Sequence, residues 1–166
     1  MRTFMRGAIL TLAGLMVGAC SQPGSTAATG HDGVPPAAQV TVLMREVAPS
    51  EHMAGITTLP WKGGTIALFD PPFVQTRDIA LINLVNDASG QPALTARFTD
   101  EAAPRIEQAT KARVGRQVAL TVDDRVITVA NIAGWFGHSM QFSGEGRAET
   151  LDLYREITGQ APPVAH

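Results

Sequence analysis

The sequence predicts an α+β fold: a single small domain in which an antiparallel sheet carries helices packed on one face. Two segments, 77–99 and 115–132, each alternate in hydrophobicity on either side of turn residues, as β-hairpins do. A helical pattern lies between them and another follows them. The chain of 166 residues is 45% hydrophobic and 17% charged, which suits one domain with a sizeable core. Hairpins followed by helices favour two layers over alternating parallel βα units.

The first strand is expected at 39–47, where β-branched residues alternate with others. Residues 48–64 contain proline and glycine and are predicted to form an irregular connection. A short apolar strand at 65–69 should follow. Pro71 and Pro72 end it, because proline cannot donate a ladder hydrogen bond.

The hairpin at 77–99 begins with a strand that is apolar on both faces, which predicts a central position in the sheet. Gly90 is available for the positive φ that its turn needs. Three residues of the return strand should share one face: Leu94, Ala96 and Phe98.

A helix is expected next, with Thr99 as N-cap and Gly115 just beyond its end. Pro104 offers a later start, since proline is tolerated in the first helical turn. Asp123 and Asp124 then form the two-residue turn of the second hairpin, because aspartate tolerates positive φ better than most residues.

A last strand is expected at 138–144, followed by a final helix that begins near Arg147 and ends at Gly159. Its apolar face consists of Leu151, Leu153, Tyr154 and Ile157. Residues 160–166 are predicted to form a disordered tail.

The N-terminus has the layout of a secretory signal. Arg2 and Arg6 precede an uncharged apolar run that is too short to cross a bilayer as a helix. The run ends in Val-Gly-Ala-Cys, which resembles the lipobox of bacterial lipoproteins. Residues 1–19 are therefore predicted to be a lipoprotein signal peptide. Cys20, the only cysteine, would carry the acyl chains, palmitate among them, that hold the protein on the membrane. A plain signal peptide with an incidental Cys20 is the alternative.

Residues 20–39 are rich in Gly, Ser, Pro, Thr and Ala, which predicts a flexible tether between the lipid and a folded domain at 40–159. The expected location is the periplasmic side of the cell envelope. Ser21 favours the outer over the inner membrane. The formal net charge of −2, without a basic stripe, argues against nucleic-acid binding.

Four motifs in order resemble a known family. They are PPFVQTRDI, NDASGQPALTARFTDEAA, VGRQVALTVDDRVITVANI and MQFSG. The segment from Val40 to Gly159 is similar to the head subdomain of the first periplasmic domain of SecD, an accessory component of the Sec protein-translocation machinery. The chain departs from the family pattern at Asp124, Asn131, Trp135-Phe136 and Arg147.

The resemblance implies the α+β fold and an affinity for extended polypeptide. It does not carry over the proton-driven motor of SecD, because that motor needs transmembrane helices with ionisable residues.

No catalytic motif is evident, so an enzyme is not expected. The chain contains no Gly-x-Ser-x-Gly elbow, P-loop or His-Glu-x-x-His. Its histidines are His31, His52, His138 and His166, too scattered to predict a metal site. Asp123 and Asp124 are solvated turn residues on this interpretation, and no cofactor is expected.

Trp135 and Phe136 lie between two glycines and are the candidate protein-binding residues. If exposed, they would form an apolar contact patch. The alternative is that one or both fill the core. A sheet edge that accepts an extended segment is a second possible binding site, although the edge strand is not identifiable from the sequence.

The leading hypothesis is a non-catalytic envelope lipoprotein whose domain binds exported polypeptide or a protein partner and is linked to export. A structural or assembly lipoprotein of an envelope complex is the alternative. The sequence leaves the oligomeric state open.

Overall fold

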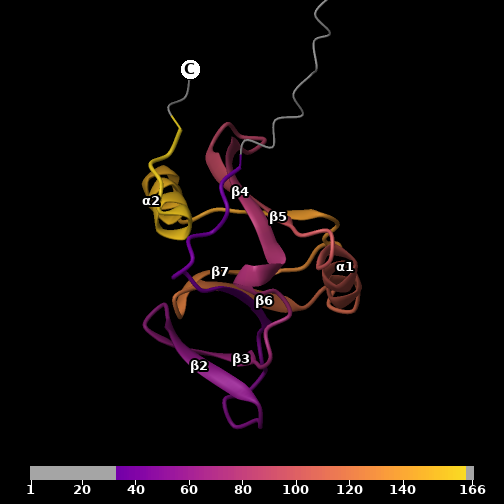
Figure 1. Cartoon of the computed structure of the whole chain (residues 1–166). Helices are drawn as coiled ribbons and strands as arrows, with labels where there is room; N and C mark the ends of the chain where they lie inside the picture. Colours follow the sequence, from indigo (N-terminus) through magenta and orange to yellow (C-terminus); the bar gives the residue numbers. More distant parts are fainter. Residues whose placement is uncertain (1–32, 164–166) are drawn as a thin grey trace, which may run out of the picture. The chain divides into compact units, whose positions relative to one another are not determined.

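The computed structural model describes residues 33–163, and these form an α+β domain with three small antiparallel sheets and two helices (Figure 1). The fold class predicted from the sequence is confirmed. The strands divide among the sheets instead of forming a single one. The predicted signal peptide, Cys20, His31 and His166 lie outside the described residues.

The first sheet has the order β1-β6-β7. Strand β1 is Val42–Glu46, β6 is Gln117–Val122 and β7 is Arg125–Asn131. Strands β6 and β7 are the hairpin predicted from the sequence. Asp123 and Asp124 form its turn with φ of 47° and 60°, as a two-residue turn of the favoured type requires.

The second sheet is a hairpin of β2, Ile56–Trp61, and β3, Gly64–Phe69. The prediction of an irregular connection at 48–64 is therefore wrong. Lys62 and Gly63 both adopt positive φ and make a tight turn, and Pro60 is accommodated because β2 has a single neighbour. Figure 1 shows this hairpin beside β6 and away from the β4–β5 hairpin.

The third sheet has the order β4-β5-β8. Strand β4 is Ile79–Asn86, β5 is Pro92–Phe98 and β8 is Ser139–Phe142. The predicted central position of β4 is wrong, because β5 lies in the centre. The short 3-10 helix η1, Thr76–Asp78, leads into β4. The turn at Gly90 and the buried face of β5 are as predicted.

Helix α1 is Ala103–Lys111, and a turn that begins at Thr99 precedes it. Thr99 accepts a hydrogen bond from the Ala102 N–H at 3.2 Å but is not the N-cap, because Pro104 lies in the first helical turn and sets the later start. Helix α2 is Arg147–Thr158 and ends at Gly159 in a left-handed conformation, as predicted. No helix among residues 33–163 is long and apolar enough to cross a bilayer.

The β1-β6-β7 sheet separates two hydrophobic cores. One face, with Val118 and Leu120, belongs to the main core, and both helices contribute buried residues to it. The other face, with Ala119, packs on the β2–β3 hairpin in a second core. Alternation along β6 explains the division, since successive strand residues point to opposite faces.

The described N-terminal segment belongs to the domain. Val34 pairs with Ile82 of β4, and the Ala37 N–H donates to the Ile157 carbonyl of α2 at 2.8 Å. The folded unit therefore begins before Val40, where the sequence placed its boundary.

Candidate functional site

The main candidate site is a groove between β7 and β8, the adjacent edges of two sheets. Its volume is about 280 Å³. We call it the β7–β8 groove. Its lining comes from the first sheet, the loop after β7 and strand β8. These residues are Met44, Val118, Leu120, Thr128, Ala130, Asn131, Ile132, Ala133, Gly134, Phe136, Met140, Gln141 and Phe142.

Every residue that lines this groove is uncharged. Met140 and Leu120 are 5% and 1% exposed, so the bottom of the groove is apolar. Strands β7 and β8 each pair on one side only within residues 33–163. Their outer backbone groups can therefore form hydrogen bonds with an added extended segment. The groove combines apolar contact with backbone pairing.

The loop 132–138 joins β7 to β8 and contains Trp135 and Phe136, for which the sequence allowed either exposure or burial. Phe136 is half-buried and packs against the main core, whereas Trp135 is 60% exposed. One residue thus fills the interior and lines the groove, and the other offers an apolar surface to solvent. The Lys111 Nζ lies 5.2 Å from the centroid of the Trp135 ring, within cation–π range.

Backbone hydrogen bonds fix this loop on the end of α1. The Phe136 N–H donates to the Thr110 Oγ1 at 3.0 Å, and Thr110 itself is fully buried. The Gly115 N–H donates to the Ile132 carbonyl at 2.8 Å. Trp135 therefore projects from a well-anchored segment, which lowers the entropic cost of using it in binding.

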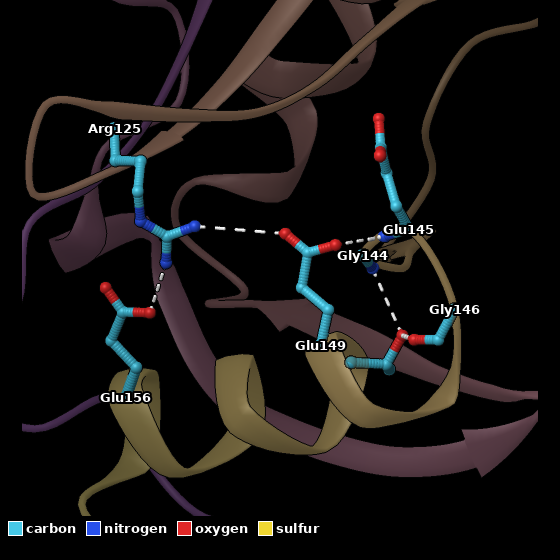
Figure 2. Close-up of polar contacts among 7 residues, drawn as sticks. Arg125, Gly144, Glu145, Gly146, Glu149 and Glu156 are labelled. Carbon is cyan, nitrogen blue, oxygen red and sulfur yellow. Dashed lines mark hydrogen bonds and ion pairs between the residues drawn. The ribbon is translucent and has the colours of Figure 1, made fainter.

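Charged side chains lie outside the lining of the groove, at the start of β7. Arg125, the first residue of β7, forms ion pairs with Glu149 and Glu156 of α2 (Figure 2). The two carboxylates are 40% and 33% exposed. The α2 carboxylates thus contact the hairpin turn region as well as water.

An ion pair with a buried arginine lies on the opposite face of the first sheet. The Arg45 Nε contacts the Asp70 Oδ1 at 2.9 Å, and Thr57 donates a hydrogen bond to the same carboxylate. The Thr57 hydrogen bond and the Arg45 guanidinium lower the pKa of Asp70 below its ordinary value, against the partial desolvation that raises it. These contacts hold the β2–β3 hairpin on the sheet.

Other residues of chemical interest do not assemble into a site. Among residues 33–163 no three His, Cys, Asp or Glu side chains come close enough to hold a metal ion. The Asp123 Oδ1 accepts the Thr41 N–H at 2.8 Å, which ties the hairpin turn to the residue before β1. Asp123 thus has a structural role in the turn.

Two larger hollows are less suited to an apolar segment. One of about 520 Å³ at the start of α1 is bordered by Arg77, Asp78, Glu101 and Arg105. Another of about 480 Å³ lies beside α2 and includes Arg147 and Arg155. Both carry charges that an apolar polypeptide would have to desolvate.

Sequence reasoning identified Trp135 and Phe136 but not the groove. Alternation along 118–122 places Val118 and Leu120 on one face, yet it does not show that β8 lies in another sheet beside them. That arrangement depends on the pairing of β8 with β5, such as Met140 with Ala96. The pairing is between distant segments and has no local sequence signal.

Comparison with known proteins gives the class of this domain. The profile of the SecDF P1 head subdomain matches residues 52–155. The chain belongs to this family, and the resemblance seen in the four motifs is confirmed.

Similarity to individual SecDF proteins agrees with this family assignment. The chain is 34% identical over 58 residues to the protein translocase subunit SecDF of Thermus thermophilus, a match that spans 35% of this chain and 8% of that protein. A crystal structure of SecDF in a super-membrane-facing form covers 81% of this chain and 21% of its own, with a TM-score of 0.53 and 22% identity.

A further structure, from work on SecDF as a membrane component that enhances protein export, covers 95% of this chain and 78% of its own. Its TM-score is 0.50 and its identity 20%. These similarities show the fold. This chain matches only a small part of full-length SecDF.

Proposed function

We propose that this domain binds extended, apolar polypeptide in the β7–β8 groove and acts in protein export. The observation that supports this function is the groove itself: two strands that each pair on one side only within residues 33–163 border an uncharged hollow with an apolar bottom. An extended segment would pair with an edge through its backbone and place alternate side chains in the hollow. Main-chain pairing is tolerant of sequence, which suits varied exported chains.

Trp135 supplies the second element of the proposed site. An exposed tryptophan on an anchored loop is typical of residues that dominate binding energy in protein contacts. Its position next to the groove allows a bound segment to contact both. Family membership supports the link to export, since a relative in this family is a protein translocase subunit.

The proposal includes a lipid anchor on Cys20 and no catalytic activity. Acyl chains on Cys20 would hold the domain at the periplasmic side of the envelope, on the outer membrane by preference, with residues after Cys20 as a tether. Replacement of Cys20 by Ala should abolish incorporation of labelled palmitate and release the protein from membranes. Retained membrane attachment of the Cys20→Ala variant would contradict the anchor.

Binding is tested by fluorescence with Trp61→Phe, which leaves Trp135 as the single tryptophan. Titration with an uncharged, apolar peptide of about eight residues should shift the Trp135 emission. The same peptide with every backbone nitrogen methylated cannot donate a ladder hydrogen bond from either edge and should bind at least tenfold more weakly. Equal affinity for the two peptides would contradict strand addition.

In cells, a photocrosslinker at Trp135 should label exported chains. A crosslinker at Met53 is the matched control, because Met53 is 42% exposed and lies in the segment before β2. Heterogeneous products from position 135 alone support the proposal. A single stoichiometric product would favour a structural role in an envelope complex.

A further inference from the structure

The two ends of the β7–β8 groove are closed in different ways. At one end the loop 132–138 connects the strands covalently and is fixed on α1. At the other end lie the start of β7 and the end of β8, and no peptide segment joins them directly. Figure 2 shows that side chains make the connection there.

The connection runs through Glu149. The Arg125 Nη1 lies 4.0 Å from the Glu149 Oε1, and the Glu149 Oε2 accepts the Glu145 N–H at 2.5 Å. The Thr150 Oγ1 accepts the Gly144 N–H at 3.1 Å. Residues 144 and 145 come two and three positions after Phe142, the last residue of β8, so these contacts link the start of β7 to the end of β8.

Glu156 strengthens the connection from the next turns of α2, where it pairs with the same guanidinium. The Arg125 side chain is 50% exposed. Ion pairs this exposed contribute little to stability and weaken with salt. They can therefore break and re-form while the buried cores stay intact.

The groove is too small to hold a strand unless this connection opens. A volume of about 280 Å³ lies just below the range of roughly 300–1,000 Å³ that is usual for small-molecule pockets. It accommodates a few side chains but not a backbone segment lying along the whole of β8. Binding a strand requires β7 and β8 to separate, and separation is easiest at the end without the covalent loop.

We propose that Arg125, Glu149 and Glu156 form a clasp that sets the width of the β7–β8 groove, and that its release admits a polypeptide strand. The admission step rests on the proposed binding function. Arg125 is a positioning residue on this account. It acts on the groove through Glu149 and the segment that follows β8, without lining the groove itself.

The test measures opening without any peptide. In a Cys20→Ala background, a cysteine at Val118, which is 5% exposed and lines the groove, reports opening by its rate of reaction with a thiol reagent. A cysteine at Ala67, also 5% exposed but in the β2–β3 hairpin, reports unfolding. The Arg125→Ala change should raise the rate at position 118 by about three- to tenfold more than it changes the rate at position 67.

Two further variants separate the clasp from a general loss of stability. Glu149→Gln keeps an oxygen that accepts the Glu145 N–H but removes the charge, so it should produce part of the Arg125→Ala effect, because the pair of Arg125 with Glu156 remains. Arg155→Ala removes a surface pair with Asp152 on the same helix and should change neither rate. In the protein with Arg125 intact, 1 M salt should also raise the rate at position 118.

Equal acceleration at both cysteines, or acceleration at neither, would overturn the clasp. If Val118→Cys does not fold, Met140→Cys provides the same test from the β8 side, because Met140 is also 5% exposed. The apolar peptide then distinguishes the two proposals. Faster association with Arg125→Ala supports both, while selective opening without peptide binding in any variant supports the clasp and contradicts the binding function.

Discussion

The two faces of the β1-β6-β7 sheet are covered in contrasting ways. On one face the β2–β3 hairpin packs tightly, and Arg45 and Asp70 form an ion pair there in which the arginine is 9% exposed. On the other face the third sheet leaves a groove along β7, and the nearby ion pairs of Arg125 are largely solvated. Desolvated contacts fix geometry, whereas solvated ones permit motion. The contrast separates a contact that fixes the β2–β3 hairpin on the sheet from ion pairs that water can replace.

Truncation of a side chain in the second core, between the β2–β3 hairpin and the first sheet, should cause the largest loss of stability. Leu68 is fully buried in the second core, so Leu68→Ala removes apolar contacts and leaves a cavity. The free energy of unfolding should fall by about 2–5 kcal/mol, measured by urea denaturation. Met53→Ala, at a residue that is 42% exposed, should change it by about 0.5 kcal/mol or less. A similar loss for both variants would break the distinction between packed and exposed apolar groups.

Loss of Arg45 should lower the free energy of unfolding more than loss of Arg125. Arg45→Ala removes a partner from Asp70 and is expected to cost about 1–3 kcal/mol. The cost stays below that of a fully buried pair because the Asp70 side chain is 35% exposed. Arg125→Ala should cost about 1 kcal/mol or less. Thermal unfolding of both variants at one salt concentration measures the difference, and equal losses would contradict the contrast between the faces.

The aromatic pair sharpens the contrast within one loop. Phe136→Ala should lower the free energy of unfolding by about 1–2 kcal/mol, because the ring packs on the main core while remaining partly exposed. Trp135→Ala should leave stability within about 0.5 kcal/mol. It should weaken binding of the apolar peptide by about tenfold, measured by calorimetry. Unchanged affinity in Trp135→Ala would exclude this side chain from the proposed site.

Local sequence patterns predicted much of this architecture. Alternation around Asp123-Asp124 predicted the β6–β7 hairpin, and Gly159 marked the end of α2 correctly. The same reasoning failed for β2, because Pro60 and the glycines nearby signal loops. This strand is stabilised by its pairing with β3 and by packing on Ala119. Such contacts join residues far apart in the chain.

The candidate site was predictable only in part, for a related reason. Two adjacent aromatics between glycines pointed to the loop 132–138, but burial decided their separate roles. Edge strands depend on which partners are present, and β4 carried enough apolar residues to suggest a central strand. The contact of Arg125 with α2 joins residues 24 and 31 positions apart, without a local signal. Lipidation at Cys20 stays a prediction.

Protonation of Asp70 at low pH should lower stability by a smaller amount than the substitutions above. Because the folded state lowers the pKa of Asp70 below about 3.8, the ionised carboxylate stabilises the fold above that pH. This contribution is lost as the pH falls through the lowered pKa, when Asp70 takes up a proton in the folded state as well. The unfolding midpoints of the unsubstituted protein and Asp70→Asn should therefore differ by a constant amount between pH 7 and pH 5 and converge below about pH 4. Other carboxylates titrate in both proteins, so the difference isolates Asp70. A difference that persisted unchanged to pH 2 would mean that the ionised Asp70 does not hold the hairpin on the sheet.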